Sequence, residues 1–142
     1  MTYLDTGCFV KLYYPEPDSA RVIAALQGQP VYYTSLHELE FVNALHLKVF
    51  SQGATLAQVT AARALVEADI KSGVLVPAGR DWNDIFREAV ILAEHHTHKL
   101  GCRSLDILHC AAAQLLAAPA FITTDVRQKK LAQALGLNLV PI

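Results

Sequence analysis

The sequence predicts an α/β protein, a three-layer α/β/α sandwich in which a short central parallel sheet lies between two layers of helices. Short apolar runs alternate with longer helical runs, which is the pattern of parallel strands joined by helices. The short runs are mostly apolar, which indicates strands covered on both faces. Hydrophobic residues make up 53% of the chain and charged residues 18%, which excludes disorder. We expect one domain over residues 1–142.

The first half of the chain contains two predicted strands and four predicted helices. The strands are Tyr3–Leu4 and Val31–Tyr33, and the helices run over about Thr6–Tyr14, Ser19–Leu26, Ser35–Phe50 and Thr55–Lys71. Capping side chains begin two of these helices, because Asp18 or Ser19 can cap the second and Ser35 the third. Residues that stop helices follow all four of them, at Pro15, Gly28, Gly53 and Gly73.

The second half of the chain repeats the alternation. Its predicted strands are Val74–Val76, Ala120–Thr123 and Leu137–Val140, and its helices run over about Asp81–His98, Ser104–Ala117 and Asp125–Leu135. No internal repeat, linker or low-complexity segment interrupts the pattern.

Charge and cysteine content limit the possible surroundings of the protein. No apolar run approaches the roughly 18–20 residues of a membrane span, and the start MTYLDTG lacks the features of a signal peptide. The cysteines Cys8, Cys102 and Cys110 form no CxxC motif, which suits a reducing compartment. We therefore expect a cytoplasmic protein without membrane contact. The net charge of −1 weighs slightly against a nucleic-acid partner, although basic residues lie close in sequence to the acidic positions described next.

Four carboxylates stand at chemically suggestive positions: Asp5, Glu40, Asp106 and Asp125. Two of them directly follow predicted strands, and the other two lie near the beginnings of predicted helices. Ligands of parallel sheets bind beyond the carboxyl ends of the strands, so all four can reach one edge of the sheet. Clustered carboxylates repel one another unless a hard cation lies between them. The pattern predicts a divalent-metal site, and such a site is typical of phosphate chemistry.

Each acid taken alone also has an ordinary interpretation. Asp5 and Asp106 suit helix N-termini, Glu40 could be a solvated surface residue, and Asp125 with Gln128 resembles a capping box. His109 lies three residues after Asp106 on the same helix face, either as a core histidine or as a neighbour of a metal-binding carboxylate.

Other enzyme classes fit the sequence less well. Asp5-Thr6-Gly7 matches the aspartic-protease triplet, but those enzymes are all-β and here a helix follows. Phosphatases of the haloacid-dehalogenase type need a second aspartate at the position of Gly7, and response receivers need an acidic pair that is not evident. The histidines near position 96 lack zinc-binding spacing, and phosphate-binding glycine loops are absent.

Over its whole length the sequence resembles the PIN-domain family, and within it the VapC-type toxins of bacterial and archaeal toxin–antitoxin pairs. The motifs that carry the resemblance are YLDTG, a helix with Ser35, Glu40 and Ala44 in the family's spacing, RSLDILHCAAA, and FITTDVRQKKLAQALGL. RSLDILHCAAA is the most specific of them. The resemblance implies a short parallel sheet flanked by helices and a metal-dependent endoribonuclease activity.

The resemblance also implies roles for individual residues. Asp5, Glu40, Asp106 and Asp125 would be the acidic quartet that holds Mg²⁺ or Mn²⁺, with Thr6 and Thr123 as supporting hydroxyls. Lys11, Arg103 and Arg127 are candidates for RNA phosphate contacts. The implied partners are an RNA substrate, a small cognate antitoxin and a second copy of the chain. The alternative is a catalytically silent PIN-like module that binds RNA or protein, and the complete quartet argues against it.

Overall fold

The computed structural model describes residues 1–142 and contains seven helices around short parallel strands, which confirms the predicted fold class. The strands are β1 (Tyr3–Leu4), β2 (Val31–Tyr33), β3 (Leu75–Pro77) and β4 (Phe121–Ile122). The helices are α1 (Thr6–Tyr13), α2 (Ser19–Leu26), α3 (Ser35–Phe50), α4 (Leu56–Ser72), α5 (Trp82–Leu100), α6 (Ser104–Leu115) and α7 (Val126–Ala134).

The strands follow the spatial order β3, β2, β1, β4, and all their pairings are parallel. In the centre, Tyr3 pairs with Phe121 and Leu4 with Ile122. A single bridge between Thr2 and Val31 joins this pair to the β2–β3 pair. The predicted last strand over residues 137–140 is reduced to one bridge, in which Leu139 pairs with Phe121. The chain there makes two backbone hydrogen bonds with β4 and no continuous ladder.

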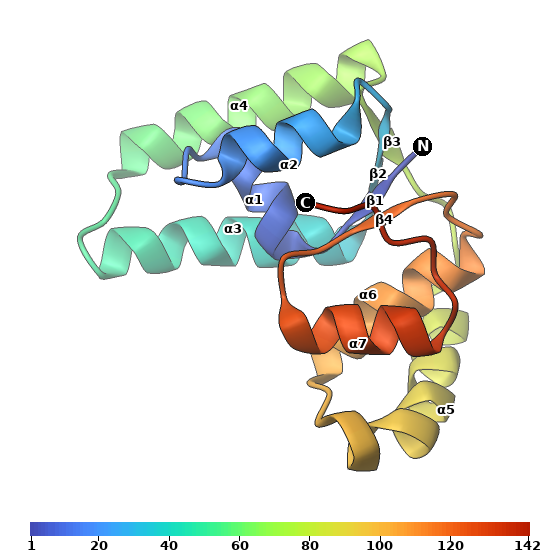
Figure 1. Ribbon diagram of the computed structural model, residues 1–142. Helices are drawn as coiled ribbons and strands as arrows, with labels where there is room; N and C mark the ends of the chain where they lie inside the picture. The colour runs from blue at the N-terminus through green and yellow to red at the C-terminus, as the bar shows by residue number, and fades with distance from the viewer.

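The two faces of the central strands enter two separate cores. Side chains alternate between the faces of a strand, so neighbouring residues point in opposite directions. Tyr3 and Phe121 pack with α5, α6 and α7, and their rings stack with centroids 5.7 Å apart. Leu4 and Ile122 pack with α1, α3 and α4. Figure 1 accordingly shows two helical lobes, α1–α4 and α5–α7, on opposite sides of the strands. Burial on both faces explains why these strands carry no polar alternation.

Capping side chains fix where several helices begin. Thr34, not the predicted Ser35, caps α3, and its hydroxyl and backbone amide form a reciprocal capping box with His37. Asp5 and Asp125 are the N-cap residues of α1 and α7, so the polypeptide turns into a helix directly after β1 and shortly after β4. The same two turns place both carboxylates at the carboxyl edge of the sheet.

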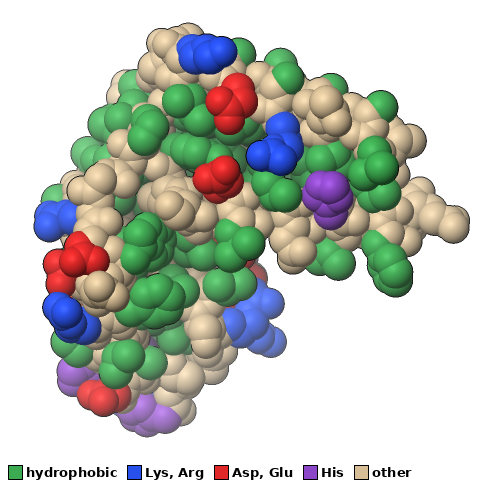
Figure 2. All heavy atoms as spheres, turned by 180° about the vertical axis from the view of Figure 1, so that it is seen from behind, with side chains coloured by type: hydrophobic (Ala, Val, Ile, Leu, Met, Phe, Trp, Pro, Cys, Tyr) green, Lys and Arg blue, Asp and Glu red, His purple; other side chains and the backbone are tan.

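The surface carries charges of both signs. Figure 2 shows basic and acidic side chains interspersed on one face, with hydrophobic side chains between them. Phe86, Val90 and Ile91 of α5 are among the exposed apolar side chains. None of the seven helices combines the length with the apolar composition that crossing a bilayer requires.

Candidate functional site

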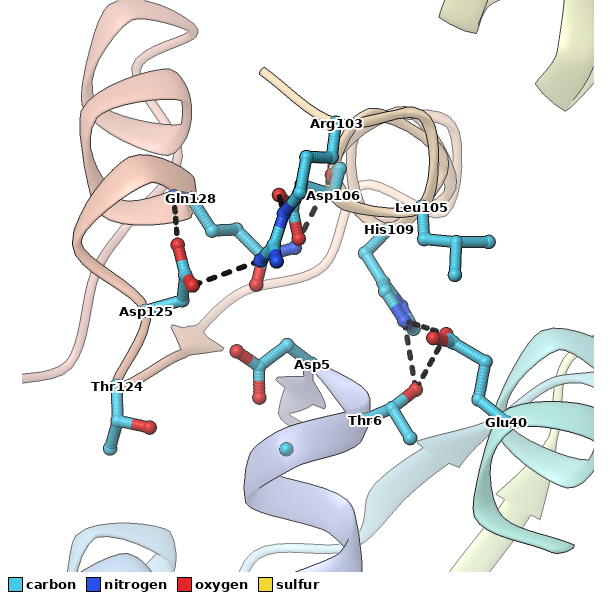
Figure 3. Close-up of a pocket in the computed structure, with 11 residues that line it drawn as sticks. Asp5, Thr6, Glu40, Arg103, Leu105, Asp106, His109, Thr124, Asp125 and Gln128 are labelled. Carbon is cyan, nitrogen blue, oxygen red and sulfur yellow. Dashed lines mark hydrogen bonds and ion pairs between the residues drawn. The ribbon is translucent and has the colours of Figure 1, made fainter. Parts of the chain in front are cut away.

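A cavity of about 400 Å³ opens at the carboxyl ends of β1 and β4, between the two lobes. It contains all four acids that the sequence singled out, although they come from four different parts of the chain (Figure 3). Leu105 is the one hydrophobic residue that lines it. The lining residues are Asp5, Thr6, Gly7, Glu40, Arg103, Leu105, Asp106, His109, Thr124, Asp125 and Gln128.

Asp5 is the most buried of the four acids. The residue is 6% exposed, and its carboxylate accepts two hydrogen bonds. The Cys8 amide donates to Oδ1 at 2.7 Å, which is the helix cap of α1, and the Thr123 hydroxyl donates to Oδ2. Asp5 is therefore an N-cap and a cavity residue at once, because a carboxylate has enough lone pairs for both roles. Thr123, one of the two hydroxyl residues that the resemblance named, therefore contacts a candidate acid directly.

Asp106 and Asp125 lie on either side of the Arg103 guanidinium. Arg103 Nε donates to Asp106 Oδ2 at 3.0 Å, and Nη2 donates to Asp125 Oδ2 at 3.1 Å. The other oxygen of Asp125 caps α7 by accepting from the Gln128 amide at 2.9 Å. These contacts show that the cavity accommodates a positive group between two carboxylates that belong to different helices.

The predicted capping box at the start of α7 is only half correct. The Asp125 side chain accepts from the Gln128 amide, but the Gln128 side chain does not return to the Asp125 amide. That amide donates instead to the Thr123 hydroxyl oxygen at 3.0 Å. Gln128 Nε2 donates to the backbone carbonyl of Asp106 at 3.3 Å, and this hydrogen bond connects α7 with α6.

Glu40 faces the cavity from α3 and is held by two polar neighbours. The Thr6 hydroxyl donates to Oε1 at 2.8 Å, and His109 Nε2 lies 2.7 Å from the same oxygen. Burial alone would raise the pKa of the Glu40 carboxyl, but the hydrogen bonds from His109 and Thr6 outweigh it and the pKa is lowered. Glu40 is therefore ionised at neutral pH. It is not the solvated surface residue that one interpretation of the sequence allowed.

His109 pairs with a different acid from the one its sequence position suggested. Spacing along α6 placed it beside Asp106, whereas its imidazole contacts Glu40 Oε1 and the Thr6 oxygen, 2.7 and 2.9 Å from Nε2. Nδ1 lies 3.0 Å from the Tyr3 hydroxyl. Sequence reasoning missed Tyr3 as a site residue. The sequence did contain a signal: Tyr3 places a hydroxyl in a short strand that is expected to be buried, so this hydroxyl needs a polar partner inside the protein.

The three basic candidates have different positions. Arg103 lines the cavity and is 60% exposed. Lys11 lies in the adjoining groove, where it pairs with Asp18 at 2.7 Å and donates to the Thr124 hydroxyl at 3.2 Å. Arg127 is exposed at the start of α7 and does not line the cavity. Of the three basic candidates, only Arg103 therefore lies in the same cavity as the four acids.

The chemistry of the cavity fits a hard divalent cation. Its donors are carboxylate oxygens, which Mg²⁺ and Mn²⁺ prefer, and the Arg103 guanidinium already bridges two of them. No three acidic, histidine or cysteine side chains lie close enough as they stand to ligate one ion. Mg²⁺ usually binds to one or two carboxylates and keeps several waters, so a pair of these acids suffices.

Comparison with known proteins gives a consistent result. The sequence profile of the PIN domain matches residues 2–134. Among solved structures, FitAcB from Neisseria gonorrhoeae is similar, with a TM-score of 0.62 at 16% identity over 99% of this chain and 97% of that one. FitAB bound to an IR36 DNA fragment has a TM-score of 0.61 at 19% identity, over 98% and 93% of the two chains. At such identities the likeness concerns the fold. A comparison with curated proteins gives no match.

Proposed function

The chain belongs to the PIN-domain family, and we propose that it is a metal-dependent endoribonuclease that hydrolyses RNA phosphodiester bonds. One observation carries the proposal: Asp5, Glu40, Asp106 and Asp125 line the same cavity at the carboxyl edge of the sheet. The fold alone would not suffice, because one fold can serve many functions.

The proposed chemistry assigns different tasks to the four acids. Asp5 and Asp106 would hold Mg²⁺ or Mn²⁺ most closely, and Asp125 and Glu40 would act in part through water. A bound ion of this kind lowers the pKa of water and stabilises charge on a phosphoryl group. The contacts of Asp5 support its task, because the Cys8 amide and the Thr123 hydroxyl fix the orientation of its carboxylate. Glu40 is ionised and can accept a proton or orient a water.

Basic side chains around the cavity are proposed to contact the RNA backbone. Arg103 is exposed at the cavity, Lys11 lies in the adjoining groove and Arg127 is exposed beyond it. Contacts of this type position a nucleic acid without reading its sequence, and they weaken as salt is added. The expected result is RNA binding whose affinity falls with increasing ionic strength.

We further propose that the protein is the toxin of a toxin–antitoxin pair and forms a homodimer. A groove of about 740 Å³ between α1 and α3 adjoins the acidic cavity and contains Leu39, Leu47 and Leu105, so a small antitoxin bound there would cover both. A separate apolar groove of about 210 Å³ lies between α5 and α6 and suits a second copy. Sedimentation of the protein alone and with its antitoxin tests both assignments.

The decisive experiment compares RNA cleavage by the wild type and by Asp106→Asn in Mg²⁺, in Mn²⁺ and in EDTA. Asp84→Asn is the matched control, because Asp84 is an exposed helix aspartate that also pairs with an arginine, at 2.8 Å. We expect discrete metal-dependent cuts from the wild type and the control, and none from Asp106→Asn. A DNA pool assayed in parallel identifies the nucleic acid.

Two results would contradict the proposal. Intact RNA with every protein, under conditions in which the chain is folded, would favour the silent binding module. Equal cleavage by the wild type and Asp106→Asn would show that the activity does not come from this cavity.

A further inference from the structure

We propose that His109 is a positioning residue that orients the Glu40 carboxylate in the cavity, and that Tyr3 in turn orients His109. The inference rests on the proposed function, because it assigns His109 a part in the same metal-dependent site. It gives a buried histidine and a buried tyrosine a role in a site otherwise made of acids.

The contacts form a connected path from the sheet to the cavity. The Tyr3 hydroxyl on β1 lies 3.0 Å from His109 Nδ1, and His109 Nε2 lies 2.7 Å from Glu40 Oε1. Exposure decreases along this path toward the core: the side chain of Glu40 is 19% exposed, that of His109 3%, and Tyr3 0%. The path therefore begins at a fixed core residue and ends at the acid that faces solvent.

Hydrogen-bond accounting identifies which ring nitrogen carries the proton. The ionised Glu40 carboxylate can only accept, so Nε2 must donate to it. An imidazole with its single proton on Nε2 accepts at Nδ1, where the Tyr3 hydroxyl lies 3.0 Å away and can donate. Burial raises the pKa of Tyr3, so this hydroxyl keeps its hydrogen. Glu40 and Tyr3 thus both favour the tautomer in which His109 donates to Glu40.

Simple packing does not account for this arrangement. An apolar side chain would fill the same space, whereas three polar groups from α1, α3 and β1 converge on the imidazole. The Thr6 hydroxyl also donates to Glu40 Oε1 at 2.8 Å, so the carboxylate receives hydrogen bonds from two neighbours on one oxygen. Its second oxygen has no protein donor and can interact with water or a cation in the cavity. Partners of this kind typically change metal affinity or activity 10–100-fold when removed.

The first test reads the tautomer directly. Long-range ¹H–¹⁵N correlation spectra of the histidine side chains, recorded above the pH range in which imidazoles ordinarily titrate, distinguish Nδ1–H from Nε2–H. We expect a fixed Nε2–H tautomer for His109 in the wild type and a mixture in Tyr3→Phe, which removes only the hydroxyl. A wild-type Nδ1–H tautomer would overturn the inference without reference to any activity.

The second test measures Mn²⁺ affinity by electron paramagnetic resonance of the free ion. We expect His109→Leu to weaken Mn²⁺ binding about tenfold or more and His109→Gln to recover part of the loss. The Mn²⁺ affinity of Tyr3→Phe should lie between those of the wild type and His109→Leu. His46→Leu is the matched control, because His46 is an exposed histidine on α3, the helix of Glu40. Thermal melts verify that each variant is folded. If His109→Leu does not fold, the comparison rests on Tyr3→Phe and His109→Gln.

A double-mutant cycle separates positioning from general structural damage. If His109 acts through Glu40, His109→Leu has no further effect on Mn²⁺ affinity in a Glu40→Gln background. An equal loss in both backgrounds, or none in the wild-type background, would overturn the inference while leaving the proposed function intact. A wild type that neither binds Mn²⁺ nor cleaves RNA would overturn the two together.

Discussion

The guanidinium of Arg103 lies between two carboxylates that we propose as metal ligands, so a divalent ion and this side chain compete for the same negative charge. The sequence assigned Arg103 to phosphate contacts, and its contacts with Asp106 and Asp125 add a second effect. Because the side chain is exposed, the competition is weakened by solvent.

We predict that Arg103→Gln strengthens Mn²⁺ binding and weakens RNA binding. Removal of one exposed ion-pair partner should improve Mn²⁺ affinity about two- to fivefold, because the carboxylates are no longer neutralised. Calorimetric titration with Mn²⁺ and filter binding of RNA measure the two effects. Arg87→Gln is the control, since Arg87 makes a similar exposed ion pair with Asp84 away from the cavity. Unchanged Mn²⁺ affinity in Arg103→Gln would show that Arg103 does not compete with the ion.

His37 provides a pH dependence that belongs to the fold. It is fully buried, donates from Nε2 to the Leu4 carbonyl and accepts at Nδ1 from the Thr34 amide. Burial, and secondly the nearby His109, lower the pKa of His37 to about 3. A protonated ring would lose the hydrogen bond from the Thr34 amide to Nδ1, because both groups would then be donors, although the Thr34 hydroxyl oxygen lies 2.9 Å from the same nitrogen.

We predict that His37 causes a loss of stability as the pH falls below about 6.5, the ordinary histidine pKa. Between that pH and the folded-state pKa of about 3, the unfolded chain binds a proton that the folded chain does not, so stability falls with decreasing pH. The slope is about 1.4 kcal/mol per pH unit. Urea unfolding at several pH values measures it, and His37→Asn, which cannot titrate, should show a flatter profile. Parallel profiles for both proteins would contradict the prediction.

At the scale of elements, the site depends on how α7 is attached to α6. The two helices carry Asp125 and Asp106. The attachment includes the buried Gln128 side chain, which donates to the Asp106 carbonyl. The separation of the two carboxylates is therefore set in part by a side chain that does not need to touch substrate.

We predict that Gln128→Met lowers the free energy of unfolding by about 1 kcal/mol, the net value of one hydrogen bond, because Met fills the same space without donating. Gln133→Met on the same helix is the control, since Gln133 is exposed. Chemical denaturation of both variants provides the measurement. If the two lose the same stability, the Gln128 hydrogen bond does not hold α7 in place.

Local sequence patterns were sufficient to predict the positions of most helices and strands, because capping residues, glycines and apolar runs influence the conformation of only a few neighbouring residues. All seven helices and the four short strands occur near their expected positions. The predicted strand at residues 137–140 is the exception. Its apolar character was correct, but pairing depends on a partner strand, and β4 has only two residues.

Sequence patterns could not predict side-chain contacts between residues that lie far apart in the chain. The four acids were found through their shared position at strand ends and helix starts, and the structure brings them to one cavity. His109 was assigned to Asp106, three residues away, because spacing reveals only neighbours. Its real partner, Glu40, is 69 residues away along the chain. Arg103 was likewise assigned to phosphate because its ion pair with Asp125, 22 residues distant, is not visible in the sequence.

At the scale of the whole molecule, the cavity lies where the two lobes meet. Asp5 and Glu40 belong to the α1–α4 side, and Asp106 and Asp125 to the α5–α7 side. Each lobe has its own core, and the central strands connect them. An ion bound by acids from both sides would stabilise the folded chain without changing either core.

We predict that Mn²⁺ raises the melting temperature of the wild type, because a ligand that binds only the folded state stabilises it by mass action. The gain is about 2.7 kcal/mol at a concentration 100 times Kd. Asp5→Asn should lose this response, whereas Asp84→Asn, on the surface of α5, should retain it. Scanning calorimetry with and without Mn²⁺ makes the comparison. Equal shifts in all three proteins would indicate nonspecific binding.

The pairing of β1 with β4 also governs when the protein can become active during its own synthesis. Asp5 is translated before its Thr123 partner and Asp125, which follow it by more than a hundred residues. At about 5–20 residues per second, several seconds pass before the ribosome has made both sides of the cavity. A nascent chain therefore has no assembled acidic site. The proposed nuclease activity therefore requires a chain that already carries both sides of the cavity, so the messenger RNA being translated is out of its reach before that point.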